Sequence, residues 1–241
     1  MIEIVSETGS TNADLAARLT RGEFAHDGDW LVADRQSAGR GRQGRAWSDA
    51  RGNFMGSTVV RALPGDPPLH TLALVAGLAV HEAVSVYIPA PARALLKWPN
   101  DVTIGAAKLA GILLERVGDA VVIGVGVNLA AAPDVAGRET VALASFDPAP
   151  DRDIFARDLA AAFAMDLGRW RTYGLPPVIA RWQAAAHPVG TLLLVGEPGE
   201  VPLSGAFAGL GSDGALLLRL PDGTTRTIHA GEVRLDPRPR H

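Results

Sequence analysis

The stretch LLKWPNDVTIGAAKLAGILLERVGDAVVIGVGVN, residues 95–128, decides the fold. It contains four apolar runs, at 95–98, 102–104, 108–116 and 120–128, and the gaps between them are short. Two of the gaps contain glycine, and apolar runs separated by turn residues predict strands joined by hairpins. We therefore expect a four-stranded antiparallel meander.

The flanking sequence adds helices and two further strands. Ser10-Thr11-Asn12 precedes apolar residues at helical spacing, which predicts a hydroxyl-capped helix. Residues 30–34 and 53–61 predict strands, and 69–86 predict a buried helix. Residues 151–173 and 177–186 predict two more helices, the first with an acidic cap. The expected fold class is α+β, with a mixed or antiparallel sheet covered by helices.

The sequence changes character after His187-Pro188. Short apolar runs at 191–195, 206–210, 215–220 and 224–229 alternate with turn sequences at 198–199, 212–214 and 222–223. This pattern predicts a small all-β module with a frayed tail at 236–241. We expect two domains, 1–187 and 188–241.

Composition excludes several classes of function. The 241 residues include 23 basic and 26 acidic side chains, a formal charge of −3, so nucleic acid is not an expected partner. The chain has no cysteine, which removes disulfides, thiolate metal sites and cysteine nucleophiles together. The six histidines show no metal-ligand spacing, and the metal ligands stay unknown. No signal peptide or membrane span is recognisable, so we expect a cytoplasmic protein without a membrane partner.

The segment at 36–47, QSAGRGRQGRAW, interleaves glycines with arginines. Glycine lets backbone N–H groups approach an anion, and arginine adds fork-shaped donors that suit carboxylate and phosphate. The spacing matches neither a Walker loop nor a Rossmann fingerprint. From the residues alone, an anion-binding loop and a solvated basic loop are both open.

Two lysines and a carboxylate stand at strand ends. Lys97 and Asp101 flank a Trp-Pro-Asn turn, and Lys108 begins an otherwise apolar strand. A lysine at a sheet end can bind an anion or simply charge an edge. Glycines at 124 and 126 leave one face of the last strand bare, which fits a planar group or close packing against a helix.

The order of the motifs is distinctive. Ser-Thr-Asn at 10–12 is followed by Gly-Arg-Gly-Arg-Gln-Gly-Arg-Ala-Trp at 39–47 and Lys-Trp-Pro-Asn-Asp at 97–101. Lys-Leu-Ala-Gly-Ile-Leu-Leu-Glu at 108–115 and Gly-Val-Gly-Val-Asn at 124–128 complete the set. From Ser6 to the C-terminus the chain resembles the biotin protein ligases. The motifs that carry this resemblance lie in the first 130 residues, and beyond residue 151 it is topological.

The resemblance implies a catalytic domain similar to the core of class II aminoacyl-tRNA synthetases, followed by a small SH3-like β-barrel. It implies that ATP, with Mg²⁺, activates biotin to biotinyl-5′-AMP. The biotin then passes to a specific lysine of a biotin carboxyl carrier protein. Because the motifs begin near the N-terminus, we expect a monofunctional enzyme without a DNA-binding domain. A homodimer is compatible with the sequence.

The same resemblance implies roles for individual residues. Those implied to bind biotin are Ser10, Thr11, Asn12, Gln36, Gly39, Arg40, Gly41, Arg42, Lys108 and Gly111. Those implied to bind ATP are Arg42, Arg45, Trp47 and Asn128. Lys108 and Arg42 are expected to neutralise the reacting anions, and Asp101 is expected to orient or deprotonate the acceptor amine. The chief rival is an ATP-dependent lipoate or octanoate ligase. A non-catalytic RNA-binding module is the alternative from another class.

Overall fold

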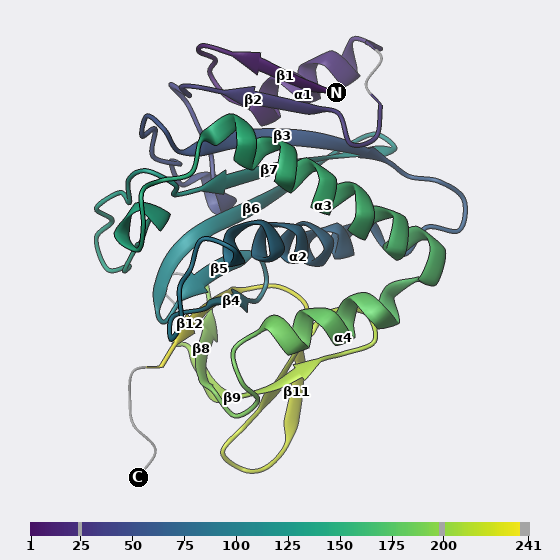
Figure 1. Ribbon diagram of the computed structural model, residues 1–241. Coiled ribbons are helices and arrows are strands. Elements are labelled where there is room, and N and C mark those ends of the chain that lie inside the picture. Colours follow the sequence, from purple (N-terminus) through teal and green to yellow (C-terminus); the bar gives the residue numbers. More distant parts are fainter. Residues whose placement is uncertain (24–25, 198–200, 237–241) are drawn as a thin grey trace.

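The computed structural model describes residues 1–23, 26–197 and 201–236. Its first part is a seven-stranded sheet in the order β1-β2-β3-β7-β6-β5-β4 (Figure 1). The strands are β1 (Ile2–Val5), β2 (Trp30–Ala33), β3 (Phe54–Arg61), β4 (Ala94–Lys97), β5 (Asp101–Ile104), β6 (Ala107–Val117) and β7 (Ala120–Val127). Strands β4 to β7 form the expected antiparallel meander, and only β1 and β2 pair in parallel among the strands described. The sheet is therefore mixed, as predicted.

Helices cover both faces of this sheet. They are α1 (Thr11–Thr20), α2 (Leu72–Ser85), α3 (Arg152–Tyr173) and α4 (Leu175–Ala185), with single turns at Arg42–Gly44, Leu69–Thr71 and Leu143–Ser145. Helix α4 begins two residues earlier than predicted because its prolines occupy the first turn, where they leave no internal hydrogen bond unmade. Ser10 caps α1, and the Asp151 carboxylate accepts from two backbone N–H groups at the start of α3.

Successive residues of each strand point to opposite faces of the sheet, and each face packs against different helices. Leu31, Val59 and Val122 pack under α1, whereas their strand neighbours face the main core beneath α2 and α3 (Figure 1). Trp30, Phe54, Phe155 and Phe163 form edge-to-face pairs with ring centroids 5.5–5.9 Å apart in that core. The larger core thus lies on the helix-rich face, and the α1 face is left free to build a site.

The second part is a five-stranded antiparallel sheet in the order β11-β10-β9-β8-β12. Its strands are β8 (Leu192–Gly196), β9 (Leu203–Leu210), β10 (Leu216–Arg219), β11 (Thr225–Ile228) and β12 (Glu232–Leu235). The predicted turn at 198–199 and all but the first residue of the predicted frayed tail lie outside the described residues. The sequence prediction missed β1 and β12, and β12 proves to be the strand that reaches the site.

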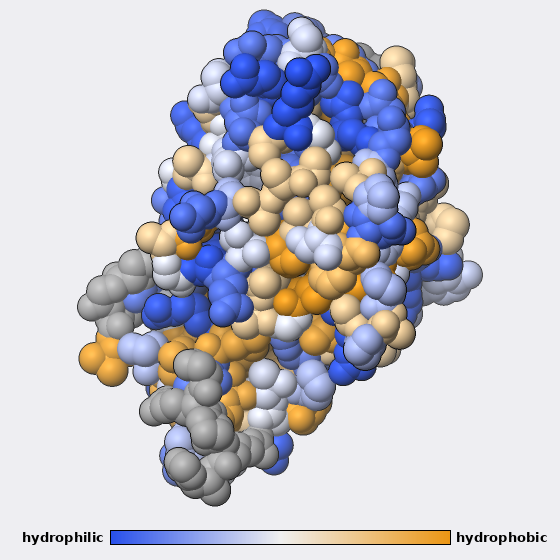
Figure 2. Space-filling view, turned by 60° about the vertical axis from the view of Figure 1, so that its left-hand side comes forward, coloured by the Kyte–Doolittle hydropathy of each residue, from blue (hydrophilic) through white to orange (hydrophobic). Residues whose placement is uncertain are grey.

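The two sheets are joined by more than the chain. The Trp98 indole nitrogen donates to the Gly214 carbonyl at 3.1 Å, and the Leu210 backbone N–H of β9 donates to Gln183 Oε1 of α4 at 2.6 Å. Hydrophilic residues cover the upper end of the molecule, whereas hydrophobic residues gather in the middle of the face seen in Figure 2. The division of the chain at residue 187 stays a prediction.

Candidate active site

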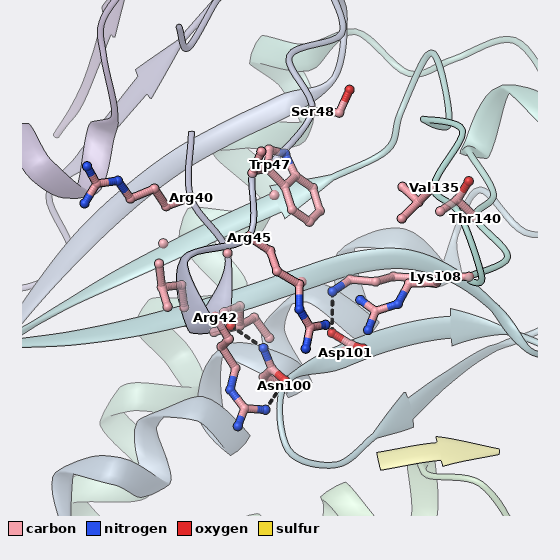
Figure 3. Close-up of a pocket in the computed structure, with 18 of the residues that line it drawn as sticks. Arg40, Arg42, Arg45, Trp47, Ser48, Asn100, Asp101, Lys108, Val135 and Thr140 are labelled. Carbon is pink, nitrogen blue, oxygen red and sulfur yellow. Dashed lines mark hydrogen bonds and ion pairs between the residues drawn. The ribbon is translucent and has the colours of Figure 1, made fainter. Parts of the chain in front are cut away.

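A cavity of about 630 Å³ lies on the α1 face of the larger sheet. Its walls come from the start of α1, the glycine–arginine loop at 40–47, the segment at 133–140 and strand β12 (Figure 3). It therefore collects segments that are more than 200 residues apart in the chain. Of the site residues predicted from sequence, every one except Gly39 lines this cavity.

The floor of the cavity is made of glycine. Strand register places Asp101, Gly111 and Gly126 side by side on β5, β6 and β7. A Cβ added at Gly126 would lie 2.3 Å from the Trp47 indole, and one added at Gly111 would lie 2.8 Å from the Lys108 ammonium. Any larger residue at either position would displace a side chain of the site, so the glycines make room for it.

Asp101 lies between two lysines beside this floor. Its carboxylate accepts from Lys108 Nζ at 2.6 Å and pairs with Lys97 Nζ at 3.1 Å (Figure 3 shows the first of these). Burial would raise the pKa of Asp101, but the two ammonium groups outweigh it and hold that pKa at about 2. Burial lowers the pKa of Lys108 more than the carboxylate raises it. Asp101 is therefore ionised at neutral pH, and it forms a compact buried cluster with the two lysines.

The glycine–arginine loop folds back on itself. Arg40 bridges to Ala46, and Gln43 adopts a left-handed φ of 56° at the tip of the turn. The loop directs Arg42 into the cavity wall, where its guanidinium donates to Asn100 Oδ1 at 3.1 Å and to the Gly231 carbonyl at 3.4 Å. In Figure 3 the side chain of Arg40 points away from Lys108 and Asp101. Arg42 thus lies beside Asn100 in the cavity wall, and Arg40 lies at the far side of the loop.

A carboxylate from the small sheet holds two more arginines. Glu232 of β12 accepts two hydrogen bonds from Arg45, at 2.8 and 2.6 Å, and one from Arg138 at 2.7 Å. The hydrogen bonds from Arg45 outweigh partial burial and lower the pKa of Glu232. This cluster ties the loop and the 133–140 segment to β12 across the mouth of the cavity.

The Trp47 indole lies over the glycine floor. Lys108 Nζ is 5.6 Å from the ring centroid, within the range of a cation–π contact. The indole N–H is buried and makes no hydrogen bond to any part of the chain that the structure describes. Gly39 pairs with the backbone of this residue, because its carbonyl accepts from the Trp47 backbone N–H at 2.9 Å. Of the two glycines left open by the sequence, Gly126 therefore faces a planar group.

The other glycine, Gly124, faces helix α1, where an added Cβ would meet the Asn12 side chain. Asn12 belongs to a buried polar group at the closed end of the cavity, together with Ser10, Thr11, Gln36 and Ser57. Among these, Ser57 was not expected from sequence. Its position on β3, in register with Gly124, places its hydroxyl beside the amide of Asn12.

Asn128 has a supporting position in this structure. Its side-chain amide donates to the Val141 carbonyl at 3.1 Å and to the Lys108 carbonyl at 3.4 Å. The Lys108 backbone N–H in turn donates to the Glu139 carbonyl at 2.8 Å. Asn128 thereby fixes the segment that carries Arg138 against the strand that carries Lys108.

Besides Ser57, sequence reasoning missed four of these residues as members of the site. Lys97 and Asn100 lie inside a motif that was recognised, so the signal existed for both. Arg138 and Glu232 lie in segments without a recognisable pattern, and only the fold brings them to the cavity.

No group of three or more potential ligands among His, Cys, Asp and Glu is close enough to hold a metal ion in the described ranges. Over the same ranges, none of the helices has the length and apolar character needed to cross a bilayer.

Comparison with known proteins agrees with this geometry. Residues 6–128 match the model of the biotin/lipoate A/B protein ligase family, and residues 193–236 match the biotin protein ligase C-terminal domain. The chain is 38% identical to a biotin–[acetyl-CoA-carboxylase] ligase of Paracoccus denitrificans, over 95% of this chain and 98% of that one. It is also 38% identical to the ligase of that name from Mycobacterium tuberculosis, over 96% and 88%.

Among solved structures, a biotin protein ligase from Aquifex aeolicus in complex with biotin and ATP superimposes with a TM-score of 0.83. The two chains are 26% identical, and the match covers 98% of each. Both family models, the curated relatives and this fold agree, and the chain belongs to the biotin protein ligase family.

Proposed function

We propose that this ATP-dependent ligase joins biotin to AMP in the cavity described above and then transfers the biotin to a lysine of a biotin carboxyl carrier protein. The observation that carries the proposal is the cluster of Lys97, Asp101 and Lys108 on a glycine floor, with the arginine loop folded over it. The reaction class follows from the family.

The charge of the cavity supports two anionic substrates. Its lining carries seven cationic side chains against three carboxylates, although the whole chain has a net charge of −3. The cations are Arg40, Arg42, Arg45, Lys97, Lys108, Arg138 and Arg234, and the carboxylates are Asp101, Glu139 and Glu232. The excess of four positive charges suits a triphosphate beside a carboxylate.

In the first step an oxygen of the biotin carboxylate attacks the α-phosphorus of ATP, and pyrophosphate leaves from the opposite side. The two reactants repel each other, so fixed cations must bring them together in line. Lys108 lies beside Gly111 on the glycine floor and Arg42 lines the same cavity, and we assign these two cations to the reacting anions. Loss of one such preorganised donor costs roughly 100- to 1000-fold in rate.

In the second step a lysine amine of the carrier protein attacks the carbonyl carbon of the mixed anhydride, and AMP leaves. Asp101 lines the cavity and is ionised, so it can accept a hydrogen bond from that amine. A carboxylate with a pKa of about 2 is a weak base. We therefore assign Asp101 the role of orienting the amine rather than that of removing its proton.

Mg²⁺ is expected to enter with ATP. The nearest carboxylates, Asp101 and Glu232, are already paired with lysines and arginines. Mg²⁺ commonly binds through substrate phosphates, water and one or two carboxylates, so the donor set fits an ion carried by ATP and not a dedicated protein site. Because the reaction consumes ATP, we propose that it takes place in the cytoplasm.

The C-terminal match favours biotin over lipoate or octanoate as the acid, because that domain is described for biotin protein ligases. The test is to incubate the full chain with ATP, Mg²⁺ and each of the three acids, and to measure the acyl-adenylate by mass spectrometry. Addition of a carrier domain should then give a single modified lysine. Adenylate with biotin alone supports the proposal. Formation of the adenylate with lipoate alone would overturn it, and so would the absence of an adenylate with all three acids.

A further inference from the structure

Five polar side chains form a continuous hydrogen-bonded chain from the closed end of the cavity to the protein surface. Gln36 Oε1 accepts from the Thr11 N–H at 2.8 Å and lies 3.1 Å from the Thr11 hydroxyl. The Thr11 and Ser57 hydroxyls are 2.7 Å apart, and Ser57 donates to Asn12 Oδ1 at 2.6 Å. The chain ends where Asn12 Nδ2 donates to the Glu115 carboxylate at 2.6 Å.

The last member differs from the others in its surroundings. Thr11, Asn12, Ser57 and Gln36 are between 0% and 7% exposed and all line the cavity. Glu115 is exposed and lies outside the cavity, near the end of β6. It ends the motif at 108–115, yet none of the chemistry proposed above uses it. Its visible contact with the site is the amide of Asn12.

The charge of Glu115 fixes the direction of the side-chain bonds that join Asn12, Ser57 and Thr11. A carboxylate only accepts hydrogen bonds, so it forces the Asn12 amide to turn its NH₂ outward and its oxygen inward. The inward oxygen takes the Ser57 proton, which leaves Ser57 to accept the proton of Thr11. Gln36 Oε1 is held by the Thr11 N–H, so its own NH₂ group is left for a ligand.

We propose that Glu115 is a positioning residue that sets the donor and acceptor order of Asn12, Ser57 and Thr11 and thereby favours an acid whose ring is a cyclic urea. Such a ring offers a carbonyl acceptor and N–H donors side by side, which match the Gln36 NH₂ and the oxygen lone pairs of Thr11 and Ser57. The dithiolane of lipoate and the alkyl chain of octanoate would leave these buried groups unpaired. Sites built to hydrogen-bond a substrate reject analogues that lack the group. The proposal rests on the proposed function of the cavity.

The first test is calorimetric binding of biotin to the wild-type chain, Glu115→Gln and Asp119→Asn. The glutamine keeps the shape but presents either oxygen or nitrogen to Asn12, so the direction of the chain is no longer enforced. We expect the Kd for biotin to rise at least tenfold in Glu115→Gln, with kcat and the KM for ATP unchanged. Asp119 is exposed at the β6–β7 turn. Asp119→Asn removes the same charge near the same end of β6, so this variant should bind biotin as the wild type does.

A double-mutant cycle separates positioning from a general effect on the fold. If Glu115 acts through Asn12, then Glu115→Gln should add less than twofold to the loss already caused by Asn12→Ala. Ser57→Ala, a smaller change, provides a second cycle with the same expectation.

Equal biotin affinity in Glu115→Gln and the wild type, or losses that multiply in both cycles, would overturn the inference. Absence of biotin binding by the wild type would instead overturn the proposed function. The two failures are therefore distinguishable.

Discussion

Replacing Asp101 by asparagine tests how much stability its carboxylate contributes by balancing the charges of the two neighbouring lysines. The asparagine keeps the shape of the side chain but leaves Lys97 and Lys108 without a counter-ion. The pKa of Asp101 in the folded protein, about 2, lies below its ordinary value of 3.8. The carboxylate therefore contributes stability that is fully present above pH 3.8 and is lost as the pH falls through 2. At neutral pH the difference corresponds to about 2.4 kcal/mol.

Removing one partner of a buried ion pair costs about 3–5 kcal/mol, so about 3 kcal/mol is a reasonable expectation for Asp101→Asn. For a chain of this size, that loss lowers the Tm by about 6–12 °C. We expect ATP at saturating concentration to narrow the gap from the wild type, because the triphosphate supplies the missing negative charge. The assay is calorimetric unfolding at pH 7.5, with Asp119→Asn as the control. A Tm within 2 °C of the wild type, or a gap that ATP leaves unchanged, would refute the reasoning.

Three further substitutions probe other parts of the structure. Gly126→Ala places a methyl group where the Trp47 indole lies and should shift tryptophan emission to the red; identical spectra would show that the indole is not seated there. Glu232→Gln releases the arginine loop and should speed tryptic cleavage at 40–45 severalfold while the Tm stays within about 2 °C, because ion pairs that water can reach contribute little stability. Cleavage at the wild-type rate would contradict the tie. Burial lowers the pKa of His187 from 6.5 to about 4, so the unfolded chain binds the proton first as the pH falls through 6.5. The wild type should lose about 2 kcal/mol between pH 8 and pH 5 in urea unfolding, and His187→Gln should lose less; equal losses would exclude His187 as the cause.

Local patterns predicted the centre of the fold well. The meander at 95–128 followed from apolar runs and glycine turns, and the two long helices followed from their periodicity and caps. Strand β1 was missed because four residues at the start of a chain carry little periodic signal, and its pairing with β2 is parallel and therefore not a hairpin. Strand β12 is equally short. Such edge strands depend on partners that the local sequence does not name.

The site divides in the same way. Asp101 and Lys108 stand in recognisable motifs, and the structure brings them within hydrogen-bonding distance. Arg45 was expected near the phosphates, but its partner Glu232 is 187 residues away and no local pattern links the two. The direction of a hydrogen-bonded chain such as the one ending at Glu115 is likewise a property of three-dimensional neighbours, and it becomes visible only when burial and donor capacity are known.

The central claim is that the Lys108 ammonium offsets the repulsion between the biotin carboxylate and the α-phosphate of ATP. The most direct test is biotin-dependent release of pyrophosphate from ATP in a single turnover, without a carrier protein, for the wild type and Lys108→Ala. The account predicts release by the wild type and a rate roughly 100- to 1000-fold lower in the variant, with its fold intact by circular dichroism. A folded Lys108→Ala variant that releases pyrophosphate at the wild-type rate would contradict the account.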